Sequence, residues 1–80
     1  MTEHPKPRQY FFFVDAKKYE TNETSLTGAA IKKIAGVDPS YQLFLEEQGD
    51  TPDKPVADSE NVHMDGKEKH FFAVPPATFG

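Results

Sequence analysis

The residues best suited to chemistry lie at the end of the sequence. After the apolar run Phe71–Val74, the chain passes into Pro75-Pro76 and then reaches Gly80. Proline has no backbone donor and a fixed φ, so the two prolines predict that a strand gives way to an extended, unpaired tail. Two interpretations are open: an ordinary frayed terminus, or a C-terminal carboxylate that serves as a chemical handle. The rest of the sequence provides the evidence that favours one interpretation over the other.

No other set of residues is typical of catalysis or metal binding. The three histidines, His4, His63 and His70, are far apart and have no partner at a metal-ligand spacing. The sequence has no cysteine, no nucleophile elbow and no glycine-rich phosphate loop. A chain of 80 residues also leaves little room for a buried pocket. We therefore expect a protein that is not an enzyme and binds no metal or cofactor.

Composition and charge argue against several kinds of partner. The formal net charge of −4 is opposite in sign to what nucleic-acid binding requires. No stretch approaches the roughly 20 apolar residues that cross a bilayer, and the N-terminus lacks the apolar segment of a signal peptide. We therefore expect a cytoplasmic protein that binds neither nucleic acid nor membrane. Without disulfides, seven Phe and three Tyr must supply a dense core for so small a domain.

The first half of the chain predicts two strands that precede a helix. Residues 1–9 carry charges and prolines, which predicts a flexible leader. Tyr10–Val14 is the strongest strand signal and is apolar on both faces, so we expect it in the middle of a sheet. Residues 15–17 predict a tight turn, although no glycine is present to favour it. Residues 18–21 then alternate charged and other side chains, as an edge strand does.

One short helix is expected next. Thr27 is a favourable N-cap, and Leu26 and Ile31 have the spacing of a hydrophobic staple. Gly36 stands where a left-handed residue ends a helix, and Lys32 and Lys33 occupy the last turn, where the helix dipole favours positive charge. A helix of about two turns is unstable alone, so its apolar stripe must pack on a sheet. That stripe comprises Ala30, Ile31, Ile34 and Ala35.

The second half predicts further strands around a polar loop. Tyr41–Leu45 alternates, with Tyr41, Leu43 and Leu45 on one face and Gln42 and Phe44 on the other. Residues 46–55 predict an exposed loop. The segment after it is weak, and its apolar anchors predict a short edge strand and irregular coil. These anchors are Val56, Val62 and Met64.

Phe44 raises the question of a binding surface. Its side chain points away from Leu43 and Leu45, and Phe72 and Val74 could share its face. If that face is uncovered, the three residues form an exposed apolar patch that binds a partner. The alternative is that the loop 46–55 folds over Phe44.

The order of elements predicts the fold. Two strands, a crossing helix and further strands indicate an α+β, β-grasp arrangement, with a mixed four- to five-stranded sheet and one helix. The right-handed crossover rule places the first and last strands side by side and parallel. We expect a domain over residues 10–74, between the leader and a tail over residues 75–80.

Four stretches in this order also carry a resemblance to a known family. They are residues 12–20, 25–31, 35–45 and the ending 74–80. Through them the chain resembles ubiquitin-like modifiers, and more closely the bacterial ubiquitin-like proteins of the multiubiquitin family. The resemblance covers roughly residues 9–80.

The resemblance implies a covalent modifier. An activating-enzyme-like protein would adenylate the Gly80 carboxylate with ATP and Mg²⁺, neither of which this chain would bind. A conjugating-enzyme-like protein would take the carboxylate as a thioester and attach it to a target, and a deconjugating metalloprotease would remove it. Enzyme channels would recognise the tail through Pro75, Pro76, Ala77, Thr78 and Phe79.

Two features depart from the pattern. Phe79 stands where ubiquitin has glycine, and the chain holds one copy of a domain that the family name describes as repeated. Two other functions therefore stay open. One is a noncovalent β-grasp adaptor; the other, which the absence of a Gly-Gly ending disfavours, is a sulfur carrier.

Overall fold

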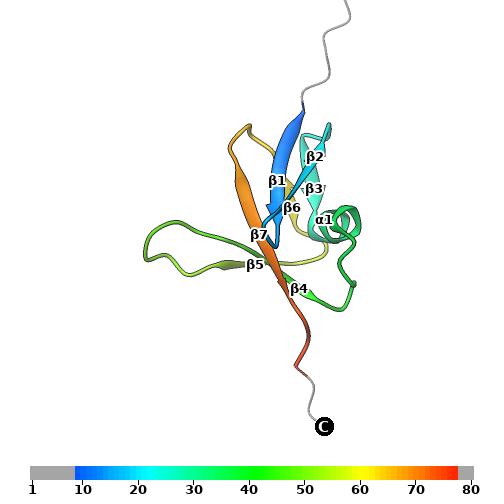
Figure 1. Ribbon diagram of the computed structural model, residues 1–80, viewed down its shortest axis with the longest axis vertical. Helices are drawn as coiled ribbons and strands as arrows, with labels where there is room; N and C mark the ends of the chain where they lie inside the picture. Colours follow the sequence, from blue (N-terminus) through cyan, green and yellow to red (C-terminus); the bar gives the residue numbers. More distant parts are fainter. Residues whose placement is uncertain (1–8, 78–80) are drawn as a thin grey trace, which may run out of the picture.

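The computed structural model describes residues 9–77. Apart from Gln9, the predicted leader lies outside the described residues, as do Thr78, Phe79 and Gly80. A five-stranded sheet with the order β2-β1-β7-β4-β5 forms the body of the domain (Figure 1). Its strands are β1 (Tyr10–Val14), β2 (Lys17–Thr21), β4 (Gln42–Leu45), β5 (Lys54–Val56) and β7 (Lys69–Val74).

The first and last strands lie side by side, as predicted. β1 and β7 are parallel, with Phe12 opposite Lys69 and Val14 opposite Phe71, whereas every other neighbouring pair in this sheet is antiparallel. β7 occupies the middle of the sheet, and β2 and β5 form its two edges. The sheet is therefore mixed, and its central strand is the one that continues into the tail.

The turn between β1 and β2 forms without glycine. Asp15 and Ala16 both adopt positive φ values, 52° and 69°, and Val14 pairs with Lys17 on either side of them. This is the backbone that a two-residue hairpin turn needs to match the twist of its strands. β2 therefore begins at Lys17, one residue earlier than the sequence predicts.

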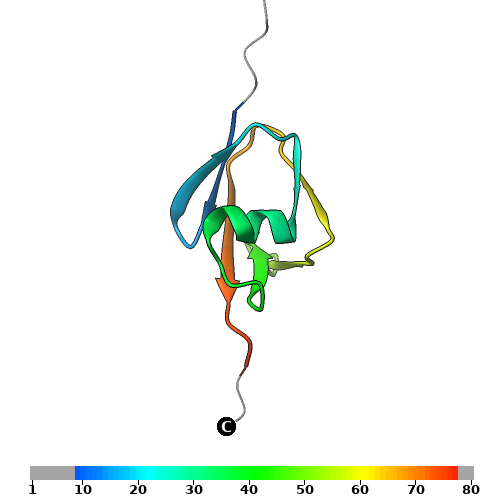
Figure 2. The same ribbon diagram turned by 90° about the vertical axis from the view of Figure 1, so that its right-hand side faces the viewer.

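The helix α1 (Gly28–Ala35) begins and ends at the predicted caps. The Thr27 hydroxyl accepts a hydrogen bond from the Ala30 N–H at 3.1 Å. Gly36, with φ 70°, ends the helix in the left-handed conformation. Gly28 lies so close to the Ala57 carbonyl that a Cβ there would clash with it. Figure 2 shows α1 crossing one face of the sheet.

The core lies between α1 and that face. The largest fully buried side chains are Phe12, Ile31, Leu43, Val56 and Phe71. Half-buried apolar residues pack around them, and among these are Ala30, Ala35 and Leu45.

The prediction that Ile34 packs in the core is wrong. Its side chain is 41% exposed and lies beside β2, in a groove that Tyr19 also lines. Tyr41 was expected within a strand, but β4 begins only at Gln42, and Tyr41 is half-buried in the preceding turn.

Two elements were not predicted as such. β3 (Ser25–Thr27) pairs antiparallel with β6 (Asn61–His63), so that Leu26 lies opposite Val62 in a separate two-stranded sheet. The predicted loop 46–55 is wrong in its last two residues, because Lys54 and Pro55 belong to β5. Proline fits there because β5 is an edge strand, where one N–H needs no partner. The whole is an α+β, ubiquitin-like β-grasp domain.

Candidate functional site

The tail leaves the domain directly from the central strand. Val74 is the last residue of β7 and pairs with Gln42 of β4. Pro75, Pro76 and Ala77 follow outside any strand or helix, and all three are exposed. The predicted tail over residues 75–80 begins with these three residues and remains a prediction. The predicted attachment residue Gly80 and its neighbours Thr78 and Phe79 lie outside the described residues.

The turn after β1 makes two hydrogen bonds to the last part of β7. The Asp15 N–H donates to the Phe71 carbonyl at 3.0 Å, and the Asp15 carboxylate accepts from the Ala73 N–H at 3.3 Å. The side chain thus provides Ala73 with an acceptor just beyond the last residue of β1. Sequence reasoning missed this role, because the bond joins residues that lie 58 positions apart in the chain.

The three residues of the predicted patch, Phe44, Phe72 and Val74, lie on the sheet face opposite α1. The Phe44 and Phe72 rings are stacked, with centroids 5.2 Å apart and planes 10° apart. Both are half-buried, and Val74 on the same side of β7 is 41% exposed. The segment between β4 and β5 projects sideways from the domain (Figure 1). Phe44 is half-buried, with Pro55 of β5 opposite it as its other strand neighbour.

The same face holds a second aromatic pair that the sequence reading missed. Phe13 of β1 stacks on His70 of β7, with centroids 4.6 Å apart and planes 7° apart. His70 and Phe72 are alternate residues of one strand, so the two pairs stand next to each other. The signal was present in the sequence, because alternation along β1 puts Phe13 opposite in direction to buried Phe12. We call this surface the open face: Phe13, Phe44, His70, Phe72 and Val74.

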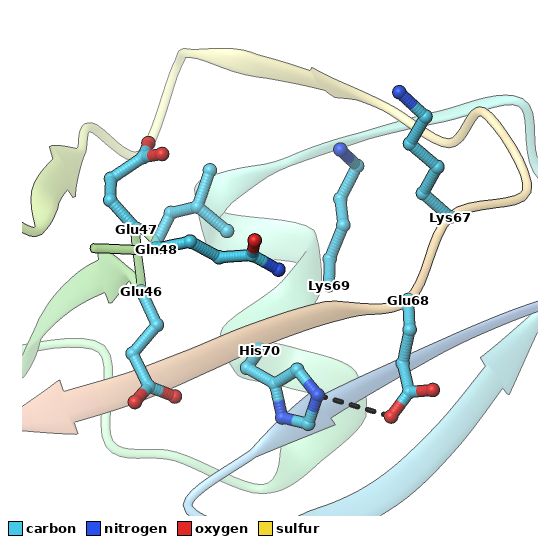
Figure 3. Close-up of a pocket in the computed structure, with 8 residues that line it drawn as sticks. Glu46, Glu47, Gln48, Lys67, Glu68, Lys69 and His70 are labelled. Atoms are coloured by element: carbon cyan, nitrogen blue, oxygen red, sulfur yellow. Dashed lines mark hydrogen bonds and ion pairs between the residues drawn. The ribbon is translucent and has the colours of Figure 1, made fainter. Parts of the chain in front are cut away.

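A polar hollow lies at one end of the open face (Figure 3). Glu46, Glu47 and Gln48 line one side of it, and residues 67–70 line the other. The His70 Nε2 atom lies 3.1 Å from a Glu68 carboxylate oxygen. Charges of both signs alternate here, and across residues 9–77 no three His, Asp or Glu side chains are grouped so as to hold a metal ion. The hollow therefore has the character of a solvated rim.

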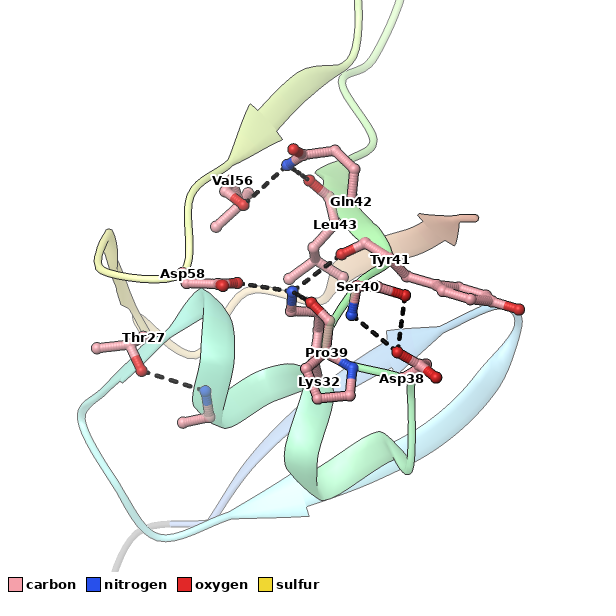
Figure 4. Close-up of polar contacts among 11 residues, drawn as sticks. Thr27, Lys32, Asp38, Pro39, Ser40, Tyr41, Gln42, Leu43, Val56 and Asp58 are labelled. Carbon is pink, nitrogen blue, oxygen red and sulfur yellow. Dashed lines mark hydrogen bonds and ion pairs between the residues drawn. The ribbon is translucent and has the colours of Figure 1, made fainter. Parts of the chain in front are cut away.

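Lys32 is the one buried charged residue among the described ones, with 4% of its surface exposed. Its Nζ donates to the carbonyls of Pro39 at 2.8 Å and Tyr41 at 2.9 Å, and lies 2.6 Å from Asp58 Oδ1 (Figure 4). The sequence reading explained Lys32 through the helix dipole alone and missed this cage. The contacts join α1 to the segments before β4 and after β5.

A neighbouring turn fixes one of these carbonyls. The Ser40 N–H and the Ser40 hydroxyl both donate to Asp38 Oδ1, at 2.8 and 2.7 Å. The backbone bond first, and then the hydroxyl bond, hold the pKa of Asp38 below its usual value. The turn carries Pro39 between these residues, so it sets the direction of the carbonyl that Lys32 binds.

The architecture defines the class of protein. A mixed five-stranded sheet crossed by one helix, with parallel first and last strands, makes the chain a ubiquitin-like β-grasp protein. The family follows from the sequence, because the family model described as Multiubiquitin matches residues 10–77. The chain belongs to the multiubiquitin family. Comparison with curated proteins and with solved structures found no significant match.

Among residues 9–77, no helix is long and apolar enough to cross a bilayer.

Proposed function

We propose that the chain is a bacterial, cytoplasmic protein modifier whose reactive group is the carboxylate of Gly80, free or freed by cleavage of a longer precursor. The observation that carries the proposal is the exit of the central strand: β7 ends at Val74 and passes into exposed Pro75, Pro76 and Ala77. Membership of the multiubiquitin family supports it. The domain would act as a handle, and the chemistry would occur at the end of the tail.

The reaction would proceed in three steps. The Gly80 carboxylate attacks the α-phosphorus of ATP in an activating-enzyme-like protein, and pyrophosphate leaves. A cysteine thiolate then attacks the acyl carbon and AMP leaves, which gives a thioester that a conjugating-enzyme-like protein can receive by exchange. An amine of the target finally attacks the thioester and displaces the thiolate, which forms an amide. A metalloprotease would hydrolyse that amide.

The residues of the tail suit this chemistry. Gly80 has no Cβ, so its carboxyl carbon can pass a narrow channel and meet a nucleophile without steric hindrance. Pro75-Pro76 favours a polyproline geometry of about 3.1 Å per residue, so the segment after Val74 can reach roughly 15–20 Å into a cleft. Phe79 would fill a pocket of the cognate enzyme, where ubiquitin enzymes accommodate glycine.

The test uses the full chain with ATP, Mg²⁺ and its activating-enzyme-like and conjugating-enzyme-like partners. Deleting Gly80 should abolish adduct formation in intact-mass spectra while leaving the thermal midpoint unchanged, because near-attack placement of the carboxyl carbon is lost and the core is untouched. Phe79→Gly should slow the cognate reaction without unfolding the domain. Adducts that form at the normal rate without Gly80 would contradict the proposal.

The open face favours a second candidate function. Two stacked aromatic pairs, Phe13–His70 and Phe44–Phe72, lie on a sheet face that no helix covers in residues 9–77, and they are suited to noncovalent binding of a partner. A β-grasp adaptor would use that face and never react at Gly80. The deletion of Gly80 separates the two functions, since an adaptor would keep all its binding.

A further inference from the structure

β7 carries its last backbone donors just before the two prolines. The Ala73 N–H points toward the β1 side of the sheet, where Asp15 accepts it. Successive residues of a strand direct their backbone groups to opposite sides, so the Val74 N–H points toward β4. The next residues on these two sides are Pro75 and Pro76, which have no N–H. The bond from Ala73 is therefore the last one that β7 can donate on its β1 side.

A side chain accepts this bond in place of the backbone. If the parallel pairing of β1 and β7 continued by one residue, the Ala73 N–H would meet the Asp15 carbonyl. Asp15 instead belongs to the hairpin turn, with a φ of 52°, and its carboxylate Oδ1 accepts from Ala73 at 3.3 Å. The Asp15 N–H donates to the Phe71 carbonyl at 3.0 Å. One residue thus holds β7 at two points beyond the end of β1 (Figure 1).

The β4 side of the strand end is fixed by other contacts. Gln42, the first residue of β4, lies opposite Val74, the last residue of β7. The Gln42 Nε2 atom donates to the carbonyls of Leu43 at 3.0 Å and Val56 at 3.1 Å, which joins the start of β4 to the end of β5. Loss of the Asp15 carboxylate would therefore free one side of the strand end and leave the other side in place.

The residues after Ala73 can pass this restraint on to the tail. A residue that precedes proline is restricted to extended conformations, which applies to Val74 and again to Pro75. Proline also fixes its own φ. The segment 74–76 therefore has few conformations. The direction in which Ala73 is held then limits the direction in which exposed Ala77 leaves the domain.

We propose that Asp15 is a positioning residue for the reaction at Gly80: its carboxylate holds the Ala73 N–H, and so orders the strand end and sets the direction of the tail before an enzyme binds it. This inference rests on the proposed modifier function. A strand end that is already ordered loses less conformational entropy when the tail enters an enzyme channel. Asp15 thus acts on binding of the tail, and the adenylation step that follows does not depend on it.

Three variants of the full chain separate the hydrogen bond from the turn and from the charge. Asp15→Gly removes the acceptor, and glycine adopts the positive φ of this turn without strain. Asp15→Asn removes the charge but keeps an acceptor oxygen and a residue type that tolerates this conformation. Ala16→Gly is the matched control, because it changes the other turn residue of positive φ, 69°, and leaves Asp15 in place. Asp15 is exposed, so all three chains should fold.

Amide-exchange NMR of the free chains reports on the strand end. The Ala73 N–H should exchange at least about tenfold faster in Asp15→Gly than in the wild type, because it loses its acceptor. Exchange in Asp15→Asn and in Ala16→Gly should stay close to the wild-type rate.

ATP–pyrophosphate exchange by the activating-enzyme-like partner, with ATP and Mg²⁺, then gives KM and kcat for each chain. Asp15→Gly should raise KM about tenfold with kcat unchanged, since fixing one more backbone residue on binding costs a factor of that order. Asp15→Asn and Ala16→Gly should have nearly the wild-type KM.

The outcomes separate this inference from the proposed function. If Asp15→Gly reacts like the wild type, or if its Ala73 N–H stays protected, the positioning role is wrong and the proposed function stands. A raised KM for Asp15→Asn with Ala73 still protected would mean that the Asp15 charge contacts the enzyme directly, which also contradicts the positioning role. If the wild-type chain supports no exchange of pyrophosphate, the proposed function fails, and the inference fails with it.

Discussion

Phe71 and Phe72 are neighbours of the same residue type on the central strand, yet they serve opposite sides of the sheet. Phe71 is 1% exposed and lies in the core with Phe12, whose ring it meets edge-on at 6.1 Å. Phe72 is half-buried and stacks on Phe44 on the open face. The inner side is closed by α1, whereas in the described chain no helix covers the outer side. Aromatic residues on the inner side hold the domain together, and those on the outer side are available to a partner.

The largest expected effect separates these two neighbours. Phe71→Ala should lower the free energy of unfolding by about 3–5 kcal/mol, because it leaves a cavity in the core. Phe72→Ala should lower it by only about 1–2 kcal/mol, because the ring is half-buried and loses one stacked pair. Urea titration followed by circular dichroism measures both.

If Phe71→Ala unfolds the domain, a milder variant at the same position can be measured in its place. Phe71→Leu keeps most of the volume and should lower the free energy of unfolding by about 1 kcal/mol. Equal losses in the two alanine variants would mean that both faces of β7 are packed alike.

The same contrast applies to α1. Ile31→Ala should lower the free energy of unfolding by about 2–5 kcal/mol, because Ile31 is fully buried. Ile34→Ala should change it by less than about 0.5 kcal/mol, since the side chain is largely exposed. Thermal and urea melts of the pair give the answer. A large loss for Ile34→Ala would restore the sequence-based expectation that this residue belongs to the core.

That expectation shows where the sequence is informative and where it is not. Thr27 and Gly36 predicted the helix ends, because capping signals are local. The order of the elements and the crossover rule predicted that the first and last strands are parallel neighbours. Ile34 has the right helical spacing, but its exposure depends on how α1 lies across the sheet, which the spacing does not determine. Three-residue strands such as β3 are too short to leave a periodic pattern. Strand alternation found Phe44 and Phe72, and it would have found Phe13 if applied to β1.

Lys32 illustrates the same limit. Nothing near it in the sequence distinguishes it from Lys33, which is exposed. Its burial depends on the carbonyls of Pro39 and Tyr41, which only the fold brings within hydrogen-bond distance. The helix dipole is a real contribution, but it describes any lysine in a last turn.

The next effect tests this cage. Lys32→Met keeps the aliphatic stem and removes the ammonium, so it should lower the free energy of unfolding by about 2–3 kcal/mol through lost charged hydrogen bonds. Asp58→Asn should lower it by less than about 1 kcal/mol, because the Asp58 side chain is 62% exposed and water screens its pairing. Denaturant melts at low and high salt check both. A loss for Asp58→Asn as large as that for Lys32→Met would place the stabilisation in the ion pair.

The open face is expected to contribute little to stability. Phe44→Ala should lower the free energy of unfolding by no more than about 2 kcal/mol, because its ring is only half-buried. Binding to the activating-enzyme-like or conjugating-enzyme-like partner should weaken, as calorimetry would show. A large stability loss with unchanged binding would assign Phe44 to the core and would show that the open face does not bind this partner.

The central claim is that Gly80 becomes covalently attached to a target, and one measurement tests it most directly. The sequence has no Lys or Arg after Lys69, so trypsin leaves the segment His70–Gly80 on any acceptor residue. Tandem mass spectrometry of adducts digested after denaturation should find that branch joined through the Gly80 carbonyl to an amine of the target. If the complexes dissociate in denaturant and no branched peptide is found, the claim is wrong and the chain acts as a noncovalent adaptor.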